Sequence, residues 1–207
     1  MEWNEHLQLA GWFRAAACAS GAYLIGCFTT GYYLVRARMG KDIREMGSGT
    51  AGARNAGRIL GKSGFFLTVL GDFGKGLLAV WLARKFSGDV FVTALSVPAV
   101  VAGHLWPVQL KFRGGKGVAT SLGALLVFDF RLALTFAAVF AAIFIFARKT
   151  LLPAMFAFLC MPVACWYFEQ NDFTLGAITI LTASILFAHR RNLAEEFVTL
   201  KTEPPNI

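Results

Sequence analysis

Lys116 stands among glycines in the string Gly114-Gly115-Lys116-Gly117, between two apolar stretches of the sequence. Glycine leaves backbone N–H groups accessible and lysine adds a positive charge, so this composition favours binding of a phosphate group. An apolar helix that begins directly after the string directs its own N–H groups and the positive end of its dipole to the same place. We therefore predict an anion site around Lys116, formed with Arg113 and the backbone of the three glycines.

A second glycine-rich string, residues 47–64, reads GSGTAGARNAGRILGKSG. Its hydroxyl, amide and guanidinium groups can donate hydrogen bonds to phosphate oxygens. It is not a nucleotide-binding P-loop, because Gly57 and Gly61 stand too close together for that motif and no strand precedes them. A flexible loop that carries ordinary basic charge is the alternative interpretation. The candidate phosphate-binding residues in this string are Gly47, Ser48, Gly49, Thr50, Arg54, Asn55 and Arg58.

Three further polar groups interrupt apolar stretches. Asp72 and Lys75 share a helix face, so they form either a structural ion pair or part of a substrate site. His104 lies at the end of the next apolar stretch, as a packing residue or a site residue. His189 and Asn192 end the last stretch in AHRRN, which is also a basic flank of the kind that fixes topology. We keep all of these except Asp72 as candidate site residues.

The composition indicates the elements that must position these groups. The chain has 207 residues, of which 57% are hydrophobic and 15% charged; an average soluble domain has about 25% charged residues. Most of its apolar runs approach the roughly 20 residues of a membrane span. We predict an all-α fold, one integral membrane domain over residues 1–207 with about seven transmembrane helices. The runs are 15–35, 65–82, 90–110, 118–128, 132–147, 151–168 and 174–188.

The two ends of the chain differ from this pattern. Residues 1–14 mix aromatic and polar residues, which predicts an interfacial helix or a flexible segment. Residues 194–207 are predicted to be a tail that ends in disorder. The four cysteines fall inside the apolar runs without metal-ligand spacing, so we expect no metal site.

The basic residues are distributed unequally between the two sides of the predicted bundle. If 36–64 is the first loop and the chain alternates sides, one side carries 15 of the 20 lysines and arginines. The positive-inside rule then places the N-terminus outside and the C-terminus in the cytoplasm. We therefore attribute the net charge of +8 to this asymmetry between the two sides and to contact with anionic lipid or an anionic substrate. It does not indicate nucleic-acid binding.

Taken in order, the polar strings resemble the bacterial acyl-phosphate:glycerol-3-phosphate acyltransferases. The resemblance runs from about Gly21 to Asn192 and rests on four strings: GSG-x-x-GA-x-N-x-x-R, D-x-x-KG, GH-x-x-PV-x-x-x-F-R-GGKGVAT and HR-x-N. It implies a seven-span inner-membrane enzyme that transfers a fatty acyl group from acyl phosphate to glycerol 3-phosphate. The products would be lysophosphatidic acid and inorganic phosphate, and no metal or cofactor would be needed.

The resemblance also implies roles for single residues. Ser48, Gly49, Asn55 and Arg58 would belong to a first phosphate site, and Lys116 with its glycines to a second. His189 and Asn192 would orient or polarise the acceptor. The catalytic candidates are thus Ser48, Lys116, His189 and Asn192; Lys75 and His104 remain candidates for substrate binding.

The sequence departs from the family pattern at three places. One is the string LAEEF after HRRN, where the family is usually more basic. The family's GSGNxGATN is here GSGTAGARN, with Thr50 and Arg54 as the changed residues, and its serine-bearing turn between later spans is here ARKTLLPAM, with Thr150 as the nearby hydroxyl. These departures leave two alternatives: a divergent paralogue that binds a phosphorylated lipid or another phospho-acceptor, and a small anion transporter. We expect a monomer in the bacterial inner membrane, with its site facing the cytoplasm.

Overall fold

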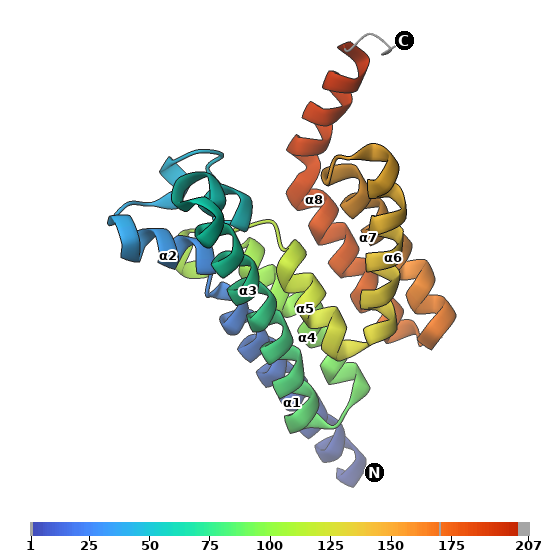
Figure 1. Cartoon of the computed structure of the whole chain (residues 1–207). Helices are drawn as coiled ribbons and strands as arrows, with labels where there is room; N and C mark the ends of the chain where they lie inside the picture. Colours follow the sequence, from blue (N-terminus) through green and yellow to red (C-terminus); the bar gives the residue numbers. More distant parts are fainter. Residues whose placement is uncertain (1, 170, 203–207) are drawn as a thin grey trace.

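The computed structural model describes residues 2–169 and 171–202, and every regular element in these ranges is helical (Figure 1). Short 3-10 turns, Ile43–Glu45 and Val108–Leu110, interrupt the connections before α3 and α5. The α-helices are α1 (Glu2–Cys27), α2 (Thr30–Met39), α3 (Ala53–Ser87), α4 (Val90–Leu105), α5 (Val118–Phe128), α6 (Phe130–Ala147), α7 (Leu151–Glu169) and α8 (Asp172–Thr202).

Five of these segments have the length and hydropathy of a membrane span. They are Ala53–Ser87, Val90–Leu110, Phe130–Ala147, Leu151–Phe168 and Asp172–Glu196, and the apolar helix Val118–Phe128 is shorter. From 65–82 onwards the predicted apolar runs fall on helices, except that the run 90–110 extends beyond the end of α4 at Leu105. The all-helical membrane class is confirmed, whereas the count of seven spans stays a prediction.

The predicted single span over 15–35 is wrong. The helix ends at Cys27, and α2 begins after Thr29, which has an extended backbone (φ −90°, ψ 99°). Two neighbouring predictions also change: α1 runs without a break through residues 2–14, and residues 53–64 of the expected first loop belong to α3. The predicted tail is helical as far as Thr202, and residues 203–207 lie outside the described ranges.

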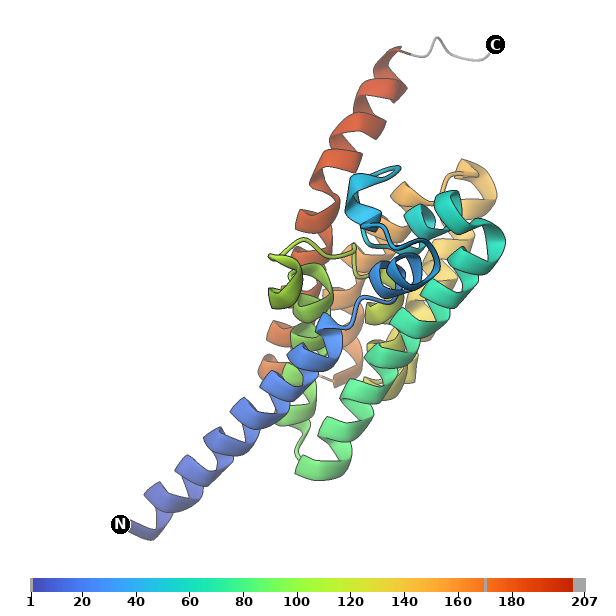
Figure 2. The same ribbon diagram turned by 90° about the vertical axis from the view of Figure 1, so that its left-hand side faces the viewer.

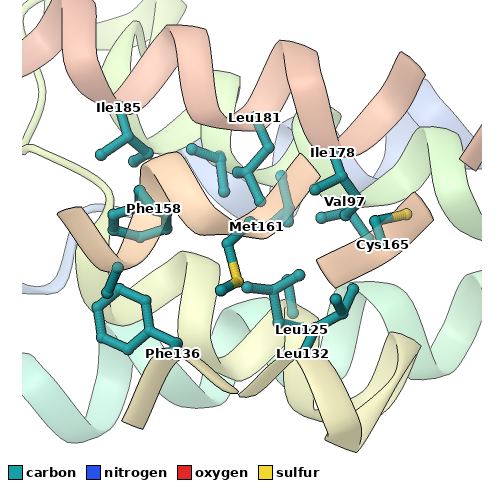
Figure 3. Close-up of a cluster of buried hydrophobic side chains, with 14 of the residues drawn as sticks. Val97, Leu125, Leu132, Phe136, Phe158, Met161, Cys165, Ile178, Leu181 and Ile185 are labelled. Atoms are coloured by element: carbon teal, nitrogen blue, oxygen red, sulfur yellow. The ribbon is translucent and has the colours of Figure 1, made fainter. Parts of the chain in front are cut away.

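One apolar core joins seven of the helices. Its buried side chains come from α1 and from α3 to α8, and Figure 3 shows its centre, where Phe158 and Met161 of α7 meet Leu125, Leu132 and Ile185 of neighbouring helices. A much smaller apolar cluster holds α2 against the start of α3. The bundle can therefore present polar groups at its ends without opening its centre.

Glycines let two helix pairs approach closely. Gly26 of α1 stands against Gly103 of α4, and Gly76 of α3 and Gly123 of α5 each lie against the partner helix's backbone. In a membrane, where lipid is as apolar as a side chain, such contacts between small residues are a main source of helix association. They hold the end of α1 against the end of α4, and the middle of α3 against the middle of α5.

The basic segments gather at one end of the bundle. Figures 1 and 2 show α2, the connection to α3, the α6–α7 turn and the end of α8 toward the same end, while the N-terminus and the α3–α4 turn lie toward the other. This arrangement agrees with the assumption, made from the sequence, that successive connections lie on alternate sides of the bundle and that the basic ones share one side. Which end faces the cytoplasm remains a prediction from charge.

We predict that Gly26→Ala destabilises the protein by about 1–3 kcal/mol, because a Cβ there would overlap the backbone carbonyl of Val100 in α4. Gly21→Ala is the matched control on the same helix, since no heavy atom lies within 4 Å of a Cβ at that position. The measurement is the midpoint of thermal unfolding in detergent. Equal midpoints for the two variants would show that the α1–α4 contact is loose.

Candidate active site

Asn55 organises the first glycine-rich segment. Its side chain is fully buried, and its Oδ1 accepts a hydrogen bond from the Ser48 N–H at 2.9 Å. Its Nδ2 faces the carbonyl oxygens of Ile43 (3.1 Å), Met46 (2.9 Å) and Thr50 (2.9 Å). Because these polar atoms are directed at the backbone of residues 43–50, Asn55 shapes this segment from within rather than reaching out of it.

The residues that Asn55 holds face outward. The Oγ of Ser48 and the Oγ1 of Thr50 lie 3.2 Å apart at the surface. Gly47 and Gly49 both have positive φ (56° and 69°), which allows the segment to turn tightly around the buried amide. A Cβ at Gly47 would also overlap Asn55 Oδ1, so this position has no room for a side chain.

The two arginines of the string lie on the first turns of α3. Arg54 and Arg58 are four residues apart, and both side chains are exposed. Arg54 donates a hydrogen bond to the hydroxyl of Thr150 in the turn between α6 and α7. This contact brings together two of the three places where the sequence departs from the family pattern.

The second glycine-rich segment is hydrogen-bonded to the first. The Ala51 N–H donates to the carbonyl of Gly114 at 3.3 Å. The N–H groups of Gly114 and Gly115 donate to the carbonyls of Leu105 and His104, both at 3.1 Å. These two amides were expected to bind an anion, but they are used to close the end of α4. What this segment offers to a ligand is therefore mainly the Lys116 side chain.

Arg113 lies apart from Lys116, although the two are close in sequence. Its side chain is exposed, and its charge acts on Asp42 in the first segment. The hydrogen-bonded guanidinium of Arg44, and more weakly the charge of Arg113, lower the pKa of the Asp42 carboxyl. We place Arg113 at the edge of the site.

Lys116 is hydrogen-bonded to α8 and lies within reach of the charges at the start of α3. Its half-buried ammonium donates to the side-chain oxygen of Asn192. Burial lowers the pKa of Lys116, and the positive charges of Arg54 and Arg58 lower it further, while the carboxylate of Glu195 opposes them. A dianionic ligand would relieve this repulsion, which is the electrostatic character of a phosphate site.

His189 lies buried next to this charge. Its Nδ1 is 2.9 Å from the carbonyl of Ile185, one turn earlier on α8. A carbonyl only accepts, so Nδ1 carries a proton and Nε2 is left as the accepting nitrogen of the neutral ring. The charges of Lys116 and Arg54 act on this imidazole. We call Arg54, Arg58, Lys116, His189 and Asn192 the cation cluster.

Lys75 and His104 are outside the cation cluster. The Lys75 Nζ lies 2.7 Å from the carbonyls of both Gly26 and Phe28, 2.8 Å from His104 Nδ1 and 3.3 Å from Asp72 Oδ1. All three side chains are buried. The geometry is that of an internal structural ion pair, which was one of the two interpretations of Asp72 and Lys75. We call these three side chains the Lys75 network.

The Lys75 network still reaches the site through the backbone. The carbonyl of His104 accepts the Gly115 N–H, and Gly115 packs against the imidazole so closely that a Cβ would overlap Nε2. Lys116 follows directly. Among residues 2–169 and 171–202, no group of three or more histidine, cysteine or acidic side chains is arranged to hold a metal ion.

Comparison with known proteins gives a consistent result. Residues 16–197 match the family described as glycerol-3-phosphate acyltransferase. Glycerol-3-phosphate acyltransferase 1 of Desulfitobacterium hafniense is 44% identical over 84% of this chain and 87% of its own length. The enzyme of Laribacter hongkongensis is 42% identical over 83% of this chain and 87% of its length.

Two solved structures share the fold. The crystal structure of PlsY, an integral membrane glycerol 3-phosphate acyltransferase, in its glycerol 3-phosphate form has a TM-score of 0.82 and 32% identity. Its lysophosphatidic acid form has a TM-score of 0.80 and 31% identity. In both cases the match covers 89% of this chain and 92% of the other.

The role of Asn55 leads to a prediction. Asn55→Asp keeps the acceptor for Ser48 but replaces the donor that faces three carbonyls with a second acceptor, so we expect exchange protection of residues 43–50 to fall about tenfold or more. Asn171→Asp is the matched control, because Asn171 Oδ1 only accepts from the N–H groups of Phe173 and Thr174, as a carboxylate can. Amide hydrogen exchange measures both. Unchanged protection in Asn55→Asp would mean that the segment is held by other contacts.

Proposed function

The chain belongs to the glycerol-3-phosphate acyltransferase family and is a membrane acyltransferase, and we propose that its donor is acyl phosphate and that the transfer takes place at the cation cluster. The observation that carries the proposal is the position of Lys116: it is held by Asn192 of α8, the charges of Arg54 and Arg58 of α3 act on it, and it acts in turn on His189, whose Nε2 is left to accept a hydrogen bond. Both proposed substrates carry phosphate, which explains a site built from positive charge.

The proposed reaction needs no covalent enzyme intermediate. A hydroxyl oxygen of glycerol 3-phosphate attacks the acyl carbon, and the new C–O bond forms as the bond between that carbon and the phosphate oxygen breaks. Phosphate leaves, and the proton of the hydroxyl ends on the departing phosphate, so charge balances. Since a mixed anhydride already has a good leaving group, positioning and electrostatic stabilisation supply most of the rate.

Four members of the cation cluster have a proposed part in this reaction, and Arg54 is treated below. Lys116 and Arg58 neutralise phosphate oxygens, with Ser48 and Thr50 as hydroxyl donors at the rim. His189 Nε2 accepts a hydrogen bond from the attacking hydroxyl and orients it. Asn192 is a positioning residue, because its side-chain oxygen holds the Lys116 ammonium.

The location of the site follows from charge. We propose that the enzyme lies in the bacterial inner membrane as a monomer, with the end of the bundle that carries the cation cluster in the cytoplasm. The excess of basic residues at that end supports this orientation. The five apolar spans and the neighbouring short helix α5 supply the membrane-embedded body.

The test is release of phosphate from palmitoyl phosphate by the purified protein. We expect release only when glycerol 3-phosphate is present, whereas a binding protein or a transporter would not couple the two. Lys116→Ala should lower kcat about 100-fold or more, in line with loss of a transition-state contact. Lys111→Ala, an exposed lysine of the same connection, is the control that should retain activity. A nearly normal rate in Lys116→Ala would remove Lys116 from the reaction.

Arg54 has two measurable effects in this scheme. Replacing it by threonine removes a guanidinium that can contact phosphate, so KM for one substrate should rise about tenfold, or ~1.4 kcal/mol. Because Arg54 lowers the pKa of Lys116, its loss raises that pKa. Lys116 acts while protonated, and therefore the fall of kcat/KM at alkaline pH should move to higher pH in Arg54→Thr.

The control for Arg54 is Arg36→Thr, which removes an exposed arginine from α2 at the same end of the bundle. It should leave both KM values and the alkaline limb in place. If Arg54→Thr behaved like this control at low and at high salt, Arg54 would be a surface residue without contact to substrate.

A further inference from the structure

Two adjacent acidic residues, Glu195 and Glu196, lie on the last part of α8, just beyond the cation cluster. This part of α8 extends past the other helices (Figure 1). Both residues belong to the string LAEEF, where the family pattern is usually more basic. Adjacent residues of an α-helix point about 100° apart, so the two carboxylates face different neighbours. Neither has a role in the reaction as proposed so far.

Glu196 forms an ion pair with the turn between α6 and α7. Its Oε1 lies 3.4 Å from the Nζ of Lys149. This oxygen is shielded from solvent and, within the residues that the structure describes, it accepts no hydrogen bond. A shielded carboxylate oxygen is costly unless a cation stands near it, so the ammonium of Lys149 is held at this place. Glu196 therefore fastens the α6–α7 turn to α8.

The next residue of the same turn contacts α3. Thr150 accepts a hydrogen bond from the guanidinium of Arg54. The turn is short, because α6 ends at Ala147 and α7 begins at Leu151, and Arg148 between them has a left-handed backbone (φ 47°, ψ 12°). Two consecutive residues of this turn thus hold two different helices, Lys149 on α8 and Thr150 on α3.

All three departures from the family pattern therefore lie in one connected set of contacts. Arg54 on α3 contacts the α6–α7 turn at Thr150, and the same turn contacts Glu196 on α8. The other acid, Glu195, acts on Lys116 in the sense opposite to Arg54. The positive charge that Arg54 adds on α3 is thus accompanied by negative charge on α8. The departures are changes to one part of the site, on the side that the α6–α7 turn covers.

We propose that Glu196 is a positioning residue for phosphate binding, which acts through Lys149 and Thr150 to hold the guanidinium of Arg54 at the cation cluster. The inference rests on the proposed function and gives a part to a residue that does not itself contact substrate. A guanidinium has five N–H donors, so the hydrogen bond to Thr150 leaves others for a phosphate group. Because a long side chain loses conformational freedom when it binds, fixing Arg54 beforehand strengthens binding.

The experiment is a double-mutant cycle of Glu196→Gln and Arg54→Thr, with palmitoyl phosphate and glycerol 3-phosphate as substrates. Glu196→Gln removes the charge and keeps the shape of the side chain. It should raise the same KM that Arg54→Thr raises, by about three- to fivefold, because a partly exposed ion pair contributes modestly. The value of kcat should stay close to that of the wild type. In the Arg54→Thr background, Glu196→Gln should have no further effect, because the guanidinium that it positions is already absent.

The matched control is Glu45→Gln, which removes an exposed carboxylate in the connection between α2 and α3 and should leave both KM values unchanged. Amide hydrogen exchange at Lys149 and Thr150, measured without substrate, gives a second readout that does not depend on turnover. It should become about threefold faster or more in Glu196→Gln.

Three results would overturn the inference: wild-type KM values in Glu196→Gln, a rise in KM that is equally large in the Arg54→Thr background, or unchanged exchange in the α6–α7 turn. A wild-type protein that does not couple phosphate release to glycerol 3-phosphate would instead contradict the proposed function. The exchange measurement would still show whether Glu196 holds the turn.

Discussion

The buried ammonium of Lys75 is the interaction on which the site depends. The break between α1 and α2 leaves carbonyl groups without helical partners, and buried carbonyl groups without a hydrogen-bond donor are costly. Lys75 reaches from α3 to two of them, Gly26 and Phe28, and Asp72 compensates its charge. Without this lysine the polypeptide would have a strong reason to continue α1 as one helix, and α2 would not lie across the end of the bundle.

The same ammonium also determines where Lys116 stands. An ammonium only donates, so His104 accepts through Nδ1 and its ring is fixed against Gly115. The backbone of His104 in turn accepts the Gly115 N–H. A charge buried for structural reasons on α3 is therefore connected, through one imidazole and one peptide group, to the half-buried ammonium of Lys116, for which we propose a contact with substrate phosphate. Dependence of a reactive group on a fixed supporting shell is what precise positioning requires.

The cation cluster brings like charges together, and the phosphate ligand that we propose for it would reduce their repulsion. Arg54, Arg58 and Lys116 repel one another, and Glu195 offsets only part of this. Arg54, one of the departures from the family pattern, adds charge at this point, and its partner is Thr150, which belongs to another of these departures. The two changes are compatible with each other because the hydroxyl gives the added guanidinium a fixed position. The structure thereby joins α3 to the α6–α7 turn across the mouth of the site.

The sequence by itself determined the class of the protein, because a high apolar content and apolar runs of span length depend only on local composition. It also identified the family through four strings in order, and it singled out Lys116, Arg58, His189 and Asn192. It could not determine which polar groups face inward. Asn55 and Lys75 look like ligand-binding residues in their strings, yet their atoms are used by the backbone, in the case of Lys75 by carbonyls 47 and 49 positions away. The break at Thr29, the engaged amides of Gly114 and Gly115, and the meeting of Arg54 with Thr150 are likewise long-range. Periodicity and spacing report the preferences of neighbouring residues, whereas these features depend on contacts that exist only after the helices have packed.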